Sequence, residues 1–182
     1  MLTNLLLFAV AIVIGFATYI AMQPRAGTVM RTGLIAATPA AVFPHINDLH
    51  RWQAWSPWAR LDPHAINTFE GPPEGIGSAF SWAGNKDVGE GKMTVVESRP
   101  PDLVRIRLDF RKPFANTSMA TFTLKTEGTG TRVAWSMTGE RPFIARLMCT
   151  LFNADKMVGT QFEKGLANLA EVVRDGGIAA SA

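Results

Sequence analysis

The sequence is poor in cysteine and in charge. Cys149 is the only cysteine among 182 residues, so neither an intrachain disulfide nor a cysteine-based metal cage can form. Charged residues make up 18% of the chain, below the usual quarter, whereas hydrophobic residues make up 47%. The net charge of +3 is mild and no basic run or stripe is present, which argues against a nucleic-acid binder. The length suits one domain with an appendage.

Signatures of nucleotide binding, metal binding and catalysis are also missing. Gly75-x-Gly77 and Gly89-x-Gly91 lack the Lys-Ser/Thr of a phosphate loop and the strand-to-helix context of a dinucleotide site, so we interpret both as turns. His45 and His50 are five apart, which excludes the zinc-type i, i+4 pair. The densest titratable group, interpreted as a surface loop, is His45, Asp48, His50, Asp62 and His64. We therefore expect no catalytic residue, no metal site and no cofactor.

The first 24 residues contain no charged side chain. Positions 5–22 are apolar apart from Thr18 and Tyr19, and these eighteen residues span roughly 27 Å as a helix, close to the hydrocarbon thickness of a bilayer. A cleavable signal peptide is the alternative. It would need a basic start and small residues at the cleavage site, whereas the chain begins MLTN and has Tyr19 near the end of the run. We predict a retained transmembrane anchor at 1–24.

The first charged side chains after this segment are Arg25 and Arg31. The positive-inside tendency then favours a single-pass membrane protein whose soluble domain lies in the cytoplasm. We expect this domain at 25–177, followed by a frayed tail at 178–182.

Apolar residues recur with a period of two through much of the soluble part. Val104, Ile106, Leu108 and Phe110 alternate with charged residues, which predicts a strand with one solvated face. The other strands are expected at 28–37, 66–70, 78–83, 92–98, 119–125 and 132–138. Short turns between successive strands predict an antiparallel meander.

Two helical regions frame the predicted sheet. Thr38-Pro39 has the pattern of an N-cap and first helical position, leading into a helix at 40–46. After Asp155, one apolar stripe recurs at spacings of four and three: Val158, Phe162, Leu166, Leu169 and Val173. We expect Gly176-Gly177 to end this helix. The apolar stretch 142–152, which contains Cys149, is interpreted as a short helix or a hydrophobic flap.

Several short motifs occur in an order found in one known superfamily. They are Val42-Phe43 with Asn47-Asp48, the segment 52–58, Phe69-Glu70-Gly71-Pro72, Gly75-Ile76-Gly77 with Trp82, Gly89-Glu90-Gly91-Lys92-Met93, and 130–135 with Met137-Thr138-Gly139. The chain resembles the SRPBCC (START-like, helix-grip) superfamily over 28–176. It is most similar to the bacterial polyketide cyclase/dehydrase-like branch, many members of which carry an N-terminal hydrophobic helix.

The resemblance implies an α+β helix-grip fold, preceded here by one N-terminal transmembrane helix. A curved antiparallel sheet would wrap around the long C-terminal helix and enclose a cavity for apolar ligands. The predicted cavity-lining, ligand-binding residues are Trp82, Met93, Ile106, Leu108, Phe110, Phe122, Trp135, Met137, Phe162 and Leu166. Trp52, Trp55 and Trp58 either line the mouth of the cavity or, as we favour, seat a loop against the sheet.

The favoured function is a membrane-anchored, non-enzymatic binder of a lipid-like or other apolar small molecule. It would contact the membrane through residues 5–22 and would not bind nucleic acid. One alternative is a polyketide cyclase or dehydratase, against which the outward placement of Arg105, Arg107 and Asp109 counts. Another is an accessory subunit that binds a second membrane protein. The sequence does not identify such a protein partner.

Overall fold

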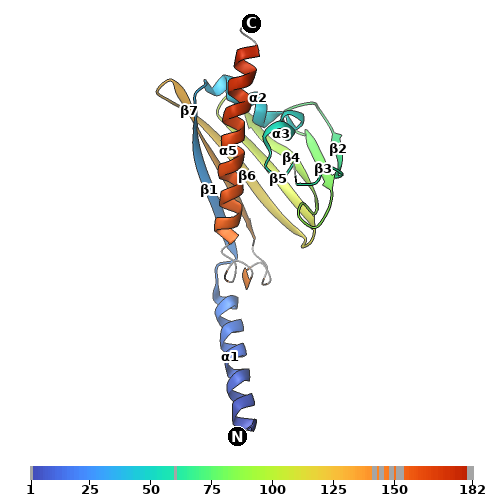
Figure 1. Cartoon of the computed structure of the whole chain (residues 1–182), viewed down its shortest axis with the longest axis vertical. Helices are drawn as coiled ribbons and strands as arrows, with labels where there is room; N and C mark the ends of the chain where they lie inside the picture. Colours follow the sequence, from blue (N-terminus) through green and yellow to red (C-terminus); the bar gives the residue numbers. More distant parts are fainter. Residues whose placement is uncertain are drawn as a thin grey trace.

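An α+β domain follows an N-terminal helix that stands apart from it (Figure 1). The structure is a computed structural model that describes residues 2–59, 61–140, 143, 146, 147, 150 and 154–179. Its elements are α1 (Leu2–Met22), β1 (Ala26–Ile35), α2 (Pro39–Asn47), α3 (Leu49–Trp55), β2 (Ile66–Glu70), β3 (Ala79–Ala83), β4 (Glu90–Arg99), β5 (Leu103–Lys112), β6 (Asn116–Glu127), β7 (Gly130–Glu140) and α5 (Ala154–Ala179).

The strands form one seven-stranded sheet in the order β1-β7-β6-β5-β4-β3-β2. Every neighbouring pair is antiparallel, so β2 to β7 form a meander and β1 closes the far edge beside β7. The predicted meander is confirmed. The alternation of β5 has the expected consequence, because Val104 and Ile106 are buried whereas Arg105 and Arg107 are exposed.

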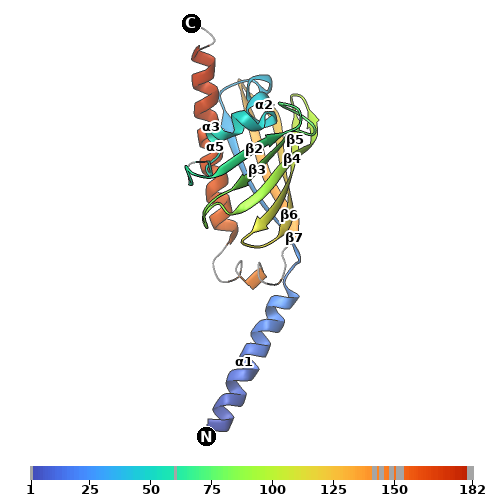
Figure 2. The same cartoon turned by 90° about the vertical axis from the view of Figure 1, so that its right-hand side faces the viewer.

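The long helix α5 lies along one face of the sheet (Figures 1 and 2). Four members of its apolar stripe are buried, and the fifth, Val158, is half-buried. At β1 the helix approaches closely, since a Cβ on Gly33 would lie 3.3 Å from the Cβ of Leu166. The predicted α+β helix-grip fold is therefore confirmed.

The expected end of this helix at Gly176-Gly177 is wrong, because α5 continues to Ala179. A glycine costs a helix about 1 kcal/mol relative to alanine but leaves its hydrogen bonds possible. Two positions assigned to the tail therefore belong to α5, and 180–182 lie outside the described residues. In the predicted flap at 142–152, the described positions 143, 146, 147 and 150 are helical. Cys149 lies outside the described residues.

The short helices α2 and α3 cover the part of the sheet that α5 leaves open. Asp48 begins α3 by accepting hydrogen bonds from the backbone N–H groups of His50 and Arg51, at 2.8 and 3.4 Å. Trp52 and Trp55 of α3 then pack against Phe122 of β6, with ring centroids 5.5 and 6.2 Å apart. Trp55 also donates from Nε1 to the carbonyl of His45 at 2.8 Å, which joins α3 to α2.

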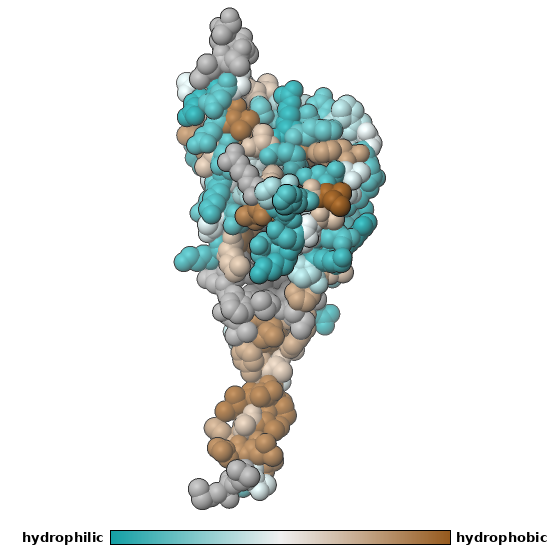
Figure 3. Space-filling view, turned by 45° about the vertical axis from the view of Figure 1, so that its right-hand side comes forward, coloured by the Kyte–Doolittle hydropathy of each residue, from teal (hydrophilic) through white to brown (hydrophobic). Residues whose placement is uncertain are grey.

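The helix α1 differs from the rest of the chain in its surface. Its residues 3–22 form the one helix, within the described part of the chain, that is long and apolar enough to cross a membrane. Almost all of these side chains are exposed, and they form the brown lower part of Figure 3 beneath a mainly hydrophilic domain. By length and composition this helix fits a membrane anchor or a signal sequence.

Candidate ligand-binding cavity

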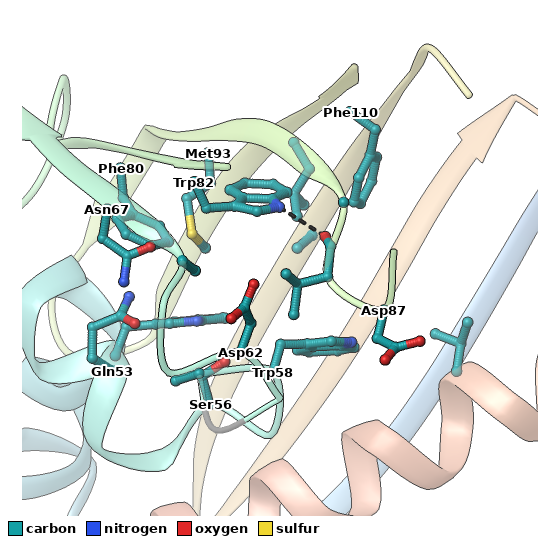
Figure 4. Close-up of a pocket in the computed structure, with 18 of the residues that line it drawn as sticks. Gln53, Ser56, Trp58, Asp62, Asn67, Phe80, Trp82, Asp87, Met93 and Phe110 are labelled. Carbon is teal, nitrogen blue, oxygen red and sulfur yellow. Dashed lines mark hydrogen bonds between the residues drawn. The ribbon is translucent and has the colours of Figure 1, made fainter. Parts of the chain in front are cut away.

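A cavity of about 330 Å³ lies between the concave face of the sheet, α3 with the loop that follows it, and the first turns of α5. Figure 4 shows it from one side, with Trp82 and Trp58 on opposite walls. The sheet contributes ten side chains from six adjacent strands, β2 to β7: Asn67, Phe80, Trp82, Met93, Leu108, Phe110, Lys112, Ala120, Trp135 and Met137. The strand period of two points all of them to the same face.

The short side chain of Ala120 helps to leave this space unfilled. Ala120 lies on β6 and pairs with Ile106 on one side and Met137 on the other. A larger residue at this central position would project between α3 and α5 into the space that is now empty. The cavity therefore depends on a small residue in the middle of a row of large ones.

The wall opposite the sheet is largely aromatic near α5. Phe162 of α5 stacks on Trp135 of β7, with centroids 4.1 Å apart and planes 9° apart. Trp58 meets both rings edge-on, at centroid distances of 6.0 and 6.3 Å. Edge-to-face and stacked pairs of this kind are worth about 0.5–1.5 kcal/mol beyond simple burial, so this corner of the wall is well fixed.

The loop between β3 and β4 forms one side of the mouth, and Trp82 holds it in place. The indole Nε1 of Trp82 donates to the carbonyl of Val88 at 3.0 Å, the dashed line of Figure 4. A Cβ on Gly91 would lie 2.5 Å from the Trp82 ring, so only glycine at this position lets the ring lie across β4. Gly91 thus combines with Trp82 to shape the wall.

Asp62 joins the loop after α3 to the β3–β4 loop. Its carboxylate accepts from the backbone N–H of Asn85 at 2.7 Å and from that of His64 at 3.0 Å. A Cβ on Gly84 would lie 2.7 Å from an oxygen of Asp62 and 2.4 Å from Val88, which shows how closely the two loops approach. One carboxylate oxygen thus joins the two loops, and the other holds the turn at His64 within the loop after α3.

Charged groups of both signs gather at the mouth. Lys86, Asp87 and Lys112 line it and are exposed. The Nζ of Lys112 lies 2.9 Å from Glu90, and this hydrogen bond with its charge holds the pKa of Glu90 below its usual value. Lys86 has no ion pair within the described part of the chain. The mouth therefore carries charged groups, while the interior is mostly apolar.

Comparison with known proteins shows which family the chain belongs to. The family model described as polyketide cyclase/dehydrase and lipid transport matches residues 26–174. The chain belongs to this family. Among curated proteins, none matches the chain.

Solved structures show the same fold at low sequence identity. Protein MLL2253 from Mesorhizobium loti is 19% identical with a TM-score of 0.59, over 82% of this chain and 97% of the other. Protein CV1439 from Chromobacterium violaceum is 16% identical with a TM-score of 0.57, over 80% and 96%. CalU16 from Micromonospora echinospora is 16% identical with a TM-score of 0.55, over 85% and 80%. Membership of the family makes binding of a hydrophobic ligand the expected function.

The structure brings seven of the ten predicted ligand-binding residues to the cavity wall. They are Trp82, Met93, Leu108, Phe110, Trp135, Met137 and Phe162. The other three, Ile106, Phe122 and Leu166, are buried in the core and do not line the cavity. Phe122 is covered by the tryptophans of α3, and Leu166 packs over Gly33. A role in ligand binding stays a prediction for all ten.

Sequence reasoning missed the polar part of the wall. Gln53, Ser56, Asp62, Lys86 and Asp87 line the cavity from α3 and from loops, where no periodic pattern marks them. Trp52 and Trp58, which we had expected to seat a loop, also line it. The run of tryptophans at spacings of three was the one signal in the sequence for this wall.

Two N–H donors in the wall have no hydrogen-bond partner among the described residues. They are Nε1 of Trp135 and Nε2 of Gln53, and both atoms are buried. An unpaired buried donor costs about 1–3 kcal/mol. Because both atoms have almost no accessible surface, neither is open to the cavity, and the accessible wall stays mostly apolar.

The predicted titratable cluster divides between two places. Asp48 caps α3 and lies 3.2 Å from Nδ1 of His50, whose ring stacks on Phe69 at 4.0 Å. Burial lowers the pKa of His45, Arg51 lowers it further, and Asp48 opposes them. Asp62 lies in the cavity wall instead. Across the described residues, no group of three His, Cys, Asp or Glu side chains could hold a metal ion.

Proposed function

We propose that the chain is a membrane-anchored protein that binds a lipid-like or other apolar small molecule in this cavity without catalysing a reaction. The observation that carries the proposal is the cavity of about 330 Å³ with aromatic and aliphatic walls. Pockets for small molecules occupy roughly 300–1,000 Å³ and are lined mainly by such residues. The space suits a compact ligand or one chain of a larger lipid.

The anchor supports the same function. Residues 3–22 would span about 30 Å as a helix, enough for the hydrocarbon core of a bilayer. A bilayer concentrates apolar molecules, so an anchored domain lies where its ligand is most abundant. We place the domain on the cytoplasmic side because the first charged side chains after the helix are Arg25 and Arg31.

A cyclase or dehydratase acting on a polyketide-like substrate is the second candidate. It is favoured by the two carboxylates in the cavity wall, Asp62 and Asp87, since acid–base chemistry needs such groups. Against it, both oxygens of Asp62 accept backbone N–H groups, and Asp87 is exposed at the mouth. The carboxylates therefore hold and border the cavity, which agrees better with binding.

The test is saturable binding of an apolar fluorescent probe to the delipidated domain beginning at Arg25. We expect one probe per chain. Ala120→Leu should weaken probe affinity by about tenfold or more while leaving the fold intact, because it fills the cavity. Ala134→Leu is the matched control, since Ala134 follows Val133 on β7 and points to the other face of the sheet. Its affinity should equal that of the native domain.

An absence of saturable binding would mean that the space is not a ligand site. The accessory-subunit interpretation would then replace the proposal. If the native domain turns over a polyketide-like substrate and Asp62→Asn does not, the cyclase would be favoured instead. Equal weakening by Ala120→Leu and Ala134→Leu would place the probe outside the cavity.

A further inference from the structure

The mouth of the cavity lies at the end of the sheet where the chain leaves α1. The strand registers place Ala26 beside Glu140, Glu90 beside Lys112, and Phe110 beside Asn116, all at this one end. The β3–β4 and β5–β6 loops are therefore at the α1 end, and they carry Lys86, Asp87, Lys112 and Pro113 of the mouth. Figure 2 shows these loops and the start of α5 on the side of the domain toward α1.

Three large apolar side chains are exposed at the same end. Phe114, Met157 and Phe143 are 59%, 62% and 40% exposed. Phe114 directly follows Pro113, and Met157 directly precedes Val158, both of which line the cavity. Exposed apolar side chains occur elsewhere too, so exposure alone does not mark a binding surface. What distinguishes these three, which we call the apolar rim, is their position. Phe114 and Met157 adjoin cavity-lining residues, and the Phe143 ring lies 5.9 Å from the guanidinium of Arg146, which contacts the end of α1.

The end of α1 is also fixed to this part of the domain. The Nη1 of Arg146 donates to the carbonyl of Ala21 at 2.8 Å and to that of Gln23 at 3.1 Å. Arg146 is only 9% exposed, and Ile20 is fully buried. The guanidinium thus satisfies carbonyls at and just beyond the last turn of α1, as a C-terminal cap does. Because the joint is packed and hydrogen-bonded, α1 determines which end of the domain faces the membrane.

We propose that the apolar rim rests in the bilayer interface, so that a ligand passes from the bilayer into the cavity without crossing bulk water. Exposed Phe and Met side chains are stabilised at the acyl boundary, and Lys86, which forms no ion pair with any described residue, is placed to meet anionic headgroups. This inference rests on the proposed function, since it concerns loading of the same cavity. It adds a second membrane contact to the one made by α1.

The docking is tested with the full chain in liposomes. A single cysteine replaces Phe114 in a Cys149→Ser background and carries an environment-sensitive fluorophore. Nitroxide groups near the top of the lipid acyl chains should quench it by about half or more, since the label would lie in the interface. The matched control is Ile76→Cys, at a position that is 63% exposed in the loop at the opposite end of the sheet. Equal, weak quenching at both positions would overturn the docking.

Loading is tested separately with a bilayer-resident dansyl fatty acid, detected by energy transfer from the tryptophans of the cavity. We expect Phe114→Asp with Met157→Asp to slow loading by about tenfold and to leave the final amount bound unchanged, whereas Ile76→Asp changes neither. Unchanged loading in the double variant would overturn direct transfer. No loading by the native chain would instead refute the proposed function, while the quenching result would still decide the docking.

Discussion

The two long helices, α1 and α5, differ in how their apolar side chains are distributed and exposed. In α1, of 21 residues, apolar side chains point in every direction, and nearly all of them are exposed. In α5, of 26 residues, they form one stripe that the sheet buries, and charged side chains occupy the other faces. The sheet is the solvent-excluding partner of α5, whereas α1 has no comparable partner in the described part of the chain.

The difference shows that the arrangement of apolar residues along a helix indicates what surrounds it. Burying a large apolar side chain is worth about 1.5–3 kcal/mol, so an isolated helix with α1's composition is strongly disfavoured in water. A bilayer removes this cost, and the absence of charge from α1 then costs nothing. A stripe such as that of α5 would be poorly suited to a bilayer because its charged faces would lie in hydrocarbon.

The strongest test of this comparison is removal of α1. We expect the full chain to stay in the membrane fraction after a high-pH carbonate wash, because a spanning helix is held almost irreversibly. The chain beginning at Arg25 should be soluble and folded. Release of the full chain by the wash, or a mature N-terminus near residue 22, would show that the helix is a signal sequence or is not inserted.

A smaller effect separates the two helices by single substitutions. Leu169 of α5 is 0% exposed, and we expect Leu169→Ala to lower the free energy of unfolding by about 2–5 kcal/mol because it leaves a hole in the core. Leu6 of α1 is 65% exposed, and Leu6→Ala should change it by less than about 0.5 kcal/mol. Unfolding of the full chain in nanodiscs measures both. A comparable loss in Leu6→Ala would mean that α1 packs against protein.

Much of the fold could be predicted because its residues follow a period. β2 was predicted at the positions it occupies, and the stripe of α5 identified the helix and the face that packs on the sheet. The end of α5 was not predictable, because Gly176 and Gly177 favour termination only weakly. A capping interaction or a proline would have been needed to decide it.

The cavity was less predictable because alternation assigns a face and not a position on that face. Ile106, Leu108 and Phe110 all point inward on β5, yet only Leu108 and Phe110 line the cavity. The tryptophans of α3 cover Phe122 in the neighbouring strand. This packing is a tertiary contact, which no local sequence pattern predicts. Loop residues such as Asp62 and Lys86 have no period at all, so the mouth could come only from the structure.

The smallest predicted effect concerns pH and again separates the two regions. His45 has a pKa lowered from 6.5, chiefly by burial, so the folded domain binds this proton less readily than the unfolded chain does. Its contribution to stability is complete above pH 6.5 and is lost as the pH falls below that value. Glu70, Glu90 and Glu127 have pKa values lowered from 4.5 by Lys92, Lys112 and Arg132, so their contributions are lost only at lower pH.

We therefore expect the unfolding temperature of the domain to fall between pH 7 and pH 5, by a few degrees at most, with a steeper loss below about pH 4.5. Membrane retention of the full chain should not change over this range, because residues 3–22 contain no acidic, basic or histidine side chain. His45→Gln should flatten the first part of the curve, whereas His64→Gln, at an exposed loop position, should leave it as it is. If the native chain and His45→Gln lose stability in parallel from pH 7 to pH 5, another group is responsible. If retention also falls with pH, the hold of α1 on the membrane includes an ionic contact, and the contrast between the two helices is weaker than their sequences indicate.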